Sequence, residues 1–243
     1  MHCFKIFICF ELVFFSVEHS EENRKTYNSI SEDWDLRRRS FDMKAKEFLQ
    51  RIPNKTEAKI ADVGCGTGRH LELAVSLGFK TNNLFGLDFS QGQLALVKEK
   101  GFNPMLCSML SLPFEDGFFD AALCIASLHH FLDYQDQLAA CREIFRVIKP
   151  GSSVLFSVWH PDKKYVAEQE RKGKFSFITE KKAIVTYTKD GCKYKRHYFF
   201  FGREGFLKVL MEAGFFVGEL TKSGGNLYAE ARKNVKFFKG QAE

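Results

Sequence analysis

A glycine-rich turn, Asp62-Val63-Gly64-Cys65-Gly66-Thr67-Gly68, carries the clearest chemical signal in the sequence. Glycine lets a backbone turn sharply and approach a ligand with no Cβ in the way. The spacing is Gly-x-Gly-x-Gly rather than the Gly-x-Gly-x-x-Gly of dinucleotide-binding turns, which favours a ligand with an amino acid moiety over a pyrophosphate. Asp62 is expected to accept a hydrogen bond from a ligand ammonium group or from the amides of the turn.

A second acidic side chain, Asp88, ends an apolar stretch that lies beyond the turn. At this point of an α/β fold a carboxylate can accept hydrogen bonds from both hydroxyls of a ribose. The alternative is that Asp88 caps the helix that follows, but Ser90 is better suited to that task. The two acidic positions together predict a ligand that carries an amino acid moiety and a ribose.

Alternating strands and helices must position these residues, and the sequence predicts such an alternation. Short apolar runs predict strands, and the stretches between them predict helices. The expected strands cover residues 59–63, 83–88, 104–107, 119–125 and 153–158, and the expected helices cover residues 69–77, 91–100 and 135–147. The alternation predicts right-handed crossovers and a parallel sheet covered on both faces, with ligands beyond the carboxyl ends of its strands.

The pattern differs on either side of this core. Residues 21–51 are charged and periodic and predict one or two helices, whereas residues 162–182 are polar and basic with no clean period. Strands are expected at 183–187 and 194–201, joined by a hairpin turn at Asp190-Gly191. A helix at 203–213 and strands at 215–220 and 227–231 complete the prediction.

The chain of 243 residues is long enough for one α/β domain. We assign residues 1–20 to an N-terminal hydrophobic extension of uncertain role, 21–235 to the domain and 236–243 to a tail. The apolar run at 6–15 contains Glu11, is followed by no small-x-small cleavage site and is too short to span a bilayer. An additional N-terminal element is therefore preferred over a signal peptide, and no membrane association is expected.

Charge and cysteine content indicate the partners and the compartment. The formal net charge is +6, and basic residues concentrate between Lys163 and Lys195, which suits contact with a polyanion or simply gives a solvated surface. The seven cysteines are scattered with no C-x-x-C pair, so neither a disulfide framework nor a metal site is predicted. We expect a reducing compartment, the cytoplasm, with the nucleus as a second location.

Several motifs, taken as a set, resemble those of the class I S-adenosylmethionine-dependent methyltransferases over about residues 58–158. They are Asp62 to Gly68, Asp88, Leu112-Pro113-Phe114, Phe119-Asp120 and Arg146-Val147-Ile148-Lys149-Pro150-Gly151. The resemblance implies a doubly wound, mostly parallel seven-stranded α/β sheet of the Rossmann-like type, with the basic insertion before the C-terminal strands, and S-adenosyl-L-methionine as the cofactor. The cofactor-binding residues that it implies are Tyr27, Asp62, Gly64, Cys65, Gly66, Gly68, Asp88, Phe89, Ser108, Met109 and Ala126.

Ser108 departs from the pattern of that family, which usually has a carboxylate at this position to bind the adenine amino group. A hydroxyl can accept the same hydrogen bond more weakly. Adenine recognition is therefore expected to rely also on the Met109 amide and on apolar contacts from Phe89.

A narrower resemblance concerns the tRNA wobble-uridine methyltransferases, which esterify the carboxylate of 5-carboxymethyluridine in the anticodon. It rests on Tyr27-Asn28-Ser29-Ile30-Ser31, Arg38, Ala126-Ser127-Leu128-His129-His130-Phe131, Val158-Trp159, Arg196-His197-Tyr198-Phe199 and Asn226-Leu227-Tyr228, and covers roughly residues 22–232. It implies tRNA as the substrate and a small zinc-binding activator subunit that docks along an edge strand. Leu132-Asp133-Tyr134-Gln135-Asp136 stands where that family has a basic doublet, so no arginine can contact RNA there.

The chemistry of ester formation fits the residues of this resemblance. A carboxylate is already anionic at neutral pH and needs no general base, so the protein has only to align it with the methyl group. We expect Arg38 and one of His129 or His130 to hold the carboxylate or an anticodon phosphate, with Trp159 as a stacking surface for the base. A neutral histidine is the preferred direct contact, because arginine would overstabilise the ground state. The further RNA contacts predicted are Arg196, Tyr198, Asn226, Lys172 and Lys174.

Each of these assignments has an alternative. The two histidines could cap the turn or pack under Phe131, Trp159 could belong to the core, and Tyr198 could belong to a buried strand. For function, the alternatives are a small-molecule methyltransferase of the ubiquinone and sterol type and a noncatalytic binding protein with the same fold. The intact glycine turn and Asp88 argue against the last of these.

Overall fold

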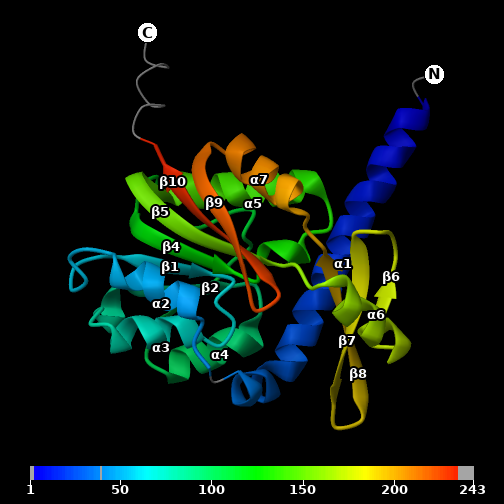
Figure 1. Ribbon diagram of the computed structural model, residues 1–243, viewed down its shortest axis with the longest axis horizontal. Coiled ribbons are helices and arrows are strands. Elements are labelled where there is room, and N and C mark those ends of the chain that lie inside the picture. The colour runs from blue at the N-terminus through cyan, green and yellow to red at the C-terminus, as the bar shows by residue number, and fades with distance from the viewer. Residues whose placement is uncertain (1–2, 39, 235–243) are drawn as a thin grey trace.

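The computed structural model describes residues 3–38 and 40–234, with side chains from His19 onward. A seven-stranded sheet forms its centre (Figure 1). The strands are β1 (Ile60–Val63), β2 (Leu84–Asp88), β3 (Asn103–Leu106), β4 (Phe119–Ile125), β5 (Ile148–Trp159), β9 (Phe215–Ser223) and β10 (Asn226–Lys233). Their order is β3-β2-β1-β4-β5-β10-β9, in which β1 to β5 are parallel and β10 is antiparallel to both neighbours. The predicted doubly wound, mostly parallel sheet is confirmed.

Helices cover both faces of this sheet (Figure 1). On one face lie α2 (Met43–Gln50), α3 (Arg69–Ser76) and α4 (Gln91–Glu99), and on the other α5 (Tyr134–Val147) and α7 (Arg203–Glu212). In β4, Ala122 and Cys124 pack on the side of α5, while Leu123 and Ile125 pack on the side of α3. Successive side chains of a strand point to opposite faces, so a strand buried on both faces has the continuous apolar sequence seen here.

Most elements of the core form within one or two residues of their expected bounds, and two short 3-10 turns, η1 (Thr81–Asn83) and η2 (Leu128–His130), lie between them. β5 is the exception, because it begins at Ile148 and continues through Pro150, whereas the sequence predicted a start at Ser153. Its pairing with β4 shifts register between Phe119 and Ala121. An irregular pairing of this kind accommodates a proline, which has no N–H to donate.

The basic insertion folds into a small unit beside the main sheet (Figure 1). It contains α6 (Lys163–Arg171) and a three-stranded antiparallel sheet of β6 (Phe175–Phe177), β7 (Lys182–Lys189) and β8 (Cys192–Phe199). The predicted hairpin is confirmed, and Asp190 and Gly191 have the positive φ angles, 50° and 77°, that its turn requires. The sequence did not predict α6, because this helix buries only Gln169 and so shows no apolar period.

Helix α1 (Cys3–Arg37) joins the insertion to the main domain and runs without a break through residue 20, where the domain was expected to begin. On one side, the Asn23 amide pairs with the backbone of His197 on the edge strand β8. On the other side, Asn28 Oδ1 accepts hydrogen bonds from Ser90 Oγ and from the Gly92 amide at the start of α4. Within the described residues, no helix combines the length and the apolar character needed to cross a membrane.

Candidate active site

A cavity opens beyond the carboxyl ends of β1, β2 and β4, where the sheet order reverses between β1 and β4. Ligands bind at this position in open α/β sheets, and the sequence predicted a ligand there. Helix α1 forms the wall opposite the glycine turn. The cavity as a whole is lined by these residues from the predicted site: Tyr27, Arg38, Gly64, Cys65, Gly66, Asp88, Phe89, Ser108, Met109, Ala126 and His130.

The turn after β1 has a geometry that glycine adopts readily. Gly64, Gly66 and Gly68 have φ angles of 74°, 57° and 83°, in a region that other residues rarely occupy. A Cβ on Gly64 would lie 2.2 Å from Ser127 Oγ, so the turn can approach the loop after β4 only without a side chain. Gly68 has a different task, because it is the N-cap of α3 and a Cβ there would meet Val97 Cγ2 at 3.3 Å.

Asp88 holds the glycine turn from the end of β2. Its Oδ2 accepts a hydrogen bond from the Gly66 amide at 3.0 Å, and its Oδ1 accepts one from the Ser90 amide at 2.9 Å. The N-cap of α4 is Ser90, whose Oγ accepts from the Gln93 amide. Burial raises the pKa of Asp88 to about 6, although the amide hydrogen bonds act in the opposite direction. A carboxylate has lone pairs for more than these two donors, so Asp88 can also accept from a ligand hydroxyl.

Two buried polar groups near the turn have no hydrogen-bond partner among the described residues. Gln93 lies in the cavity wall, is 1% exposed, and neither atom of its amide is satisfied. Asp62 Oδ2, behind the turn, is 3.5 Å from His70 Nδ1 and forms no hydrogen bond. Because buried polar atoms in folded proteins are nearly always paired, the amide of Gln93 in the cavity wall indicates a ligand with polar atoms. The amino acid and ribose parts of S-adenosylmethionine are of this kind.

His130 and Tyr27 belong to a hydrogen-bond chain with a defined direction. His130 Nδ1 lies 3.2 Å from the His197 carbonyl oxygen, which can only accept, so Nδ1 carries the proton. Burial lowers the pKa of His130 to about 3, so its Nε2 is unprotonated and accepts from Tyr27 Oη at 3.0 Å. Tyr27 Oη in turn accepts from Tyr198 Oη at 3.3 Å, and Tyr198 Oη from Arg196 Nη1 at 3.0 Å. Both nitrogens of His130 are thus engaged within the protein.

His129 and Trp159 lie behind the cavity wall. His129 Nδ1 accepts a hydrogen bond from the Trp159 amide at 3.1 Å, and its ring stacks on Tyr198 with the centroids 4.7 Å apart. Burial lowers the pKa of His129, which keeps this ring neutral as well. Trp159 packs against Phe175 and Phe200 in the core of the insertion. The side chain that the structure brings to the cavity is therefore His130.

Arg38, the residue after the end of α1, lines the cavity together with Trp34, which the sequence did not predict as a site residue. The Arg38 guanidinium lies 3.9 Å from the ring centroid of Trp34, which is also in the wall. Tyr27, Trp34 and Arg38 are seven and four residues apart, a spacing that puts them on one face of a helix. This helical spacing is the signal in the sequence that places Trp34 beside Tyr27 and Arg38.

The predicted RNA contacts divide into buried and exposed residues. Arg196 and Tyr198 are 7% and 5% exposed, so they cannot offer the surface contact that the sequence predicted, and the alternative of a buried strand is correct for Tyr198. Arg196 instead faces the rings of Trp34 and Tyr187. Asn226 is half-buried at the start of β10, opposite Trp159. Lys172 and Lys174 are exposed, and Lys172 forms an ion pair with Glu168.

The comparisons with known proteins agree with this geometry. Residues 61–156 match a family model described as a methyltransferase domain. The tRNA (carboxymethyluridine(34)-5-O)-methyltransferase alkbh8 of Xenopus tropicalis is 31% identical over 158 residues, which are 65% of this chain and 23% of that protein. A demethylmenaquinone methyltransferase of Lactococcus lactis is 31% identical over 150 residues, covering 56% of this chain and 58% of that protein. The chain thus spans less than a quarter of the first of these relatives and little more than half of the second.

A solved structure extends the likeness in fold to most of the chain. In the complex between the Haloferax volcanii Trm112 methyltransferase activator and a methyltransferase, one chain superposes with a TM-score of 0.65 at 15% identity, covering 87% of this chain and 97% of that one. Identity at this level concerns the fold alone. The strand order, the glycine turn held by Asp88 and the matched model together identify residues 61–156 as a methyltransferase domain with the class I fold.

Proposed function

We propose that this protein methylates the carboxylate of 5-carboxymethyluridine at the wobble position of tRNA, with S-adenosylmethionine as the methyl donor. One observation carries the proposal: a single cavity contains the glycine turn with Asp88 and, on its α1 wall, the Arg38 guanidinium stacked on Trp34. A cation suits a carboxylate substrate, and an aromatic ring suits its base. The named activity of the Xenopus tropicalis relative supports this choice of substrate.

The residues of the cavity would act by position rather than by proton transfer. S-adenosylmethionine supplies, when bound, a methyl group on a sulfonium that a carboxylate can attack directly. The glycine turn and Asp88 would hold the amino acid and ribose parts of the donor, while Arg38 orients the carboxylate. The neutral His130 would keep Tyr27 in place in the wall. Because the ester product is uncharged, its attraction to Arg38 is weaker than that of the substrate, which favours release.

Two partners belong to this proposal. The exposed lysines of the insertion, among them Lys172, Lys174 and Lys193, would contact tRNA phosphates and make binding sensitive to salt. A small zinc-binding activator subunit would dock along an edge strand of the main sheet. We assign it to β3, an edge strand whose Leu106 is 60% exposed. The solved complex with a methyltransferase activator supports a partner of this type.

Transfer of labelled methyl groups to tRNA tests the proposal. We expect the purified protein, assayed with and without the activator, to label tRNA with a methyl group that mild alkali removes, because esters hydrolyse in base. Arg38→Ala should abolish transfer but change the affinity for S-adenosylmethionine, measured by calorimetry, by less than about twofold. Arg37→Ala is the matched control, since Arg37 is an exposed neighbour paired with Asp33, and it should retain full activity. An alkali-stable methyl group on tRNA, or full transfer by Arg38→Ala, would contradict the proposal.

The second candidate is a small-molecule methyltransferase, which the likeness to the demethylmenaquinone methyltransferase favours. Such a substrate is apolar, so Arg38 would have no carboxylate to orient. In that case labelled methyl groups would appear in a lipid extract of quinone precursors and stay in place in alkali, and tRNA would remain unlabelled. The same labelling assay therefore separates the two candidates.

A further inference from the structure

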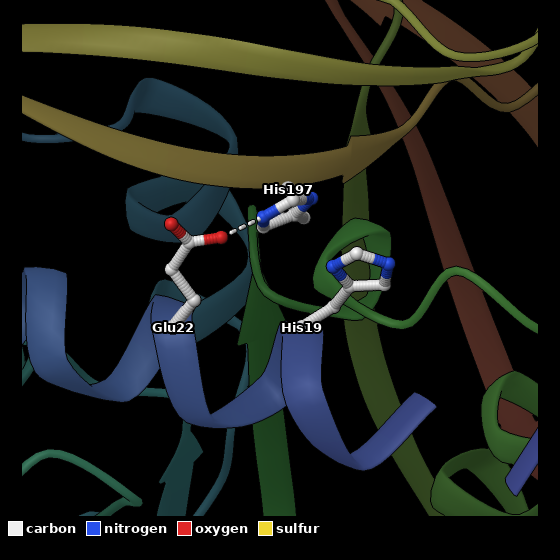
Figure 2. Close-up of side chains that lie close together, drawn as sticks. All are labelled: His19, Glu22 and His197. Carbon is white, nitrogen blue, oxygen red and sulfur yellow. Dashed lines mark hydrogen bonds and ion pairs between the residues drawn. The ribbon is translucent and has the colours of Figure 1, made fainter. Parts of the chain in front are cut away.

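Three metal-ligating side chains meet where helix α1 crosses strand β8, away from the glycine turn. His19 and Glu22 project from α1 and His197 from β8, and Figure 2 shows the three side chains pointing toward one another. One ligand atom from each residue lies within 4.8 Å of the other two. Two imidazoles and one carboxylate are a ligand set that zinc uses in proteins.

His197 is held firmly at the centre of this cluster. Its side chain is 2% exposed and its Nε2 makes a short contact with Glu22 Oε2. The ring of His19 is tilted at 37° to the ring of His197, with the centroids 4.1 Å apart. Asn23, next to Glu22, accepts from the His197 amide at 2.7 Å and donates to its carbonyl oxygen at 3.3 Å. The backbone of the buried histidine is thus fixed to the helix that carries the other two side chains.

We propose that His19, Glu22 and His197 bind a zinc ion, with a water molecule as the remaining ligand. His19 and Glu22 are three residues apart on α1, so they lie on one face of the helix. Around a tetrahedral zinc ion with bonds of about 2.0 Å, ligand atoms lie about 3.3 Å apart. The Glu22–His197 contact is shorter than this value and would have to open slightly, while no ligand atom of the three residues lies more than 4.8 Å from the other two. Zinc takes the place of the hydrogen between His197 Nε2 and Glu22 Oε2, and the neutral imidazole then carries its proton on Nδ1.

Such an ion would fasten the insertion to the N-terminal helix beside the active site. Asn23 is part of the cavity wall, and the His197 carbonyl oxygen accepts from His130, which is in the wall as well. Zinc at this point would therefore stabilise the wall that faces the glycine turn. It would not touch the methyl donor, so the proposal is independent of which substrate the enzyme uses.

Metal binding to the full chain tests the proposal. Protein freed of metal with a chelator is titrated with Zn²⁺, and with Co²⁺ as a spectroscopic probe. We expect one ion per chain, visible bands of low-coordinate Co²⁺ that Zn²⁺ abolishes, and a rise in the melting temperature when Zn²⁺ is added. A chain that binds no Zn²⁺, or binds it without a change in melting temperature, would overturn the proposal.

Variants separate this site from other metal-binding groups of the chain. Glu22→Gln and His19→Gln keep the side chains polar but each remove a direct ligand. We expect each to weaken Zn²⁺ binding by more than about 100-fold, which exceeds the effect of removing a residue that only supports a ligand. Glu21→Gln is the matched control, because Glu21 lies one residue away and pairs with Arg24. Cys192→Ser controls for the exposed thiol. If both cluster variants bind Zn²⁺ as tightly as the two controls, the ion is bound elsewhere and the assignment is wrong.

Discussion

The carboxylate of Asp88 accepts hydrogen bonds from Gly66 and Ser90, so it fixes the glycine turn before any ligand arrives. The same carboxylate lies in the cavity wall, where burial raises its pKa to about 6. At the scale of single residues, one carboxylate therefore both holds the glycine turn and faces the ligand, and its protonation state affects ligand binding. The affinity for S-adenosylmethionine should consequently depend on pH.

Asp88 must be ionised to accept hydrogen bonds from two ribose hydroxyls. In the free protein it holds a proton below about pH 6, and binding has to displace that proton. We expect the affinity for S-adenosylmethionine to fall about tenfold between pH 7 and pH 5. Calorimetry at a series of pH values measures it. Asp88→Asn should bind weakly at pH 7 with no such dependence, and a flat profile for the wild type would contradict the assignment.

Gly64 offers a steric test at the same scale. Alanine at this position would adopt an unfavourable positive φ, which costs about 1–2 kcal/mol, and its Cβ would also meet Ser127 Oγ. We expect Gly64→Ala to weaken S-adenosylmethionine binding at least about tenfold and to lower the melting temperature. Gly78→Ala is the matched control, because Gly78 also has a positive φ but has nothing within 4 Å of its Cβ position. Equal loss of binding in both variants would mean that backbone strain alone, and not the close approach, is responsible.

At the scale of elements, α1 holds the insertion and the main domain together through side chains that replace backbone pairing. The edge of β8 presents the amide and carbonyl of His197, and Asn23 satisfies both. Thr26 Oγ1 adds a hydrogen bond to the Lys195 carbonyl at 2.7 Å. An open strand edge would otherwise expose these groups to other chains, so α1 both completes the cavity and protects the small sheet.

Asn23→Ala should therefore loosen the contact between α1 and β8. Removing the amide leaves the His197 N–H without a partner and its carbonyl oxygen with only the His130 hydrogen bond, which we expect to lower the free energy of unfolding by about 1–3 kcal/mol. Chemical denaturation measures the loss, and hydrogen exchange should show faster exchange of the His197 amide. Arg24→Ala, on the exposed face of the same helix, should leave the stability nearly unchanged, because surface ion pairs contribute little. An Asn23→Ala variant as stable as this control would show that other contacts hold α1 in place.

For the whole molecule, the sequence predicted what depends on local pattern and missed what depends on distant contacts. Apolar runs, and the glycines that end the helices between them, predicted the strands of the main sheet. The hairpin was predicted from Asp190-Gly191, a pair of residues that favours a tight turn. The approach of His197 to His19 and Glu22 could not be predicted, because it depends on how β8 lies against α1. For the same reason Arg196 was expected on the surface, although the fold buries it among Trp34, Tyr187 and Tyr198.

The buried histidines of this arrangement make the stability of the whole molecule depend on pH. His129 and His130 are neutral in the folded chain, where burial holds the pKa of each below its ordinary value and that of His130 at about 3. In the unfolded chain they take up protons near pH 6.5. Their contribution is therefore complete above pH 6.5 and is lost as the pH falls below that value, for His130 down to about pH 3, by up to about 1.4 kcal/mol per pH unit.

Asp88 acts in the opposite direction over part of this range. Its folded pKa of about 6 lies above the unfolded value of about 4, so its contribution is present below pH 4 and is lost as the pH rises through 6. Because the proton uptake of two histidines has a larger effect on stability than that of one carboxylate, we expect the free energy of unfolding to decrease as the pH falls from 6.5 to 4.5. His130→Gln, which cannot take up the proton, should reduce the slope measured by urea denaturation, whatever its stability at pH 7. If the slope of this variant equals that of the wild type, His130 is not held neutral, and Tyr27 cannot be the donor to its Nε2.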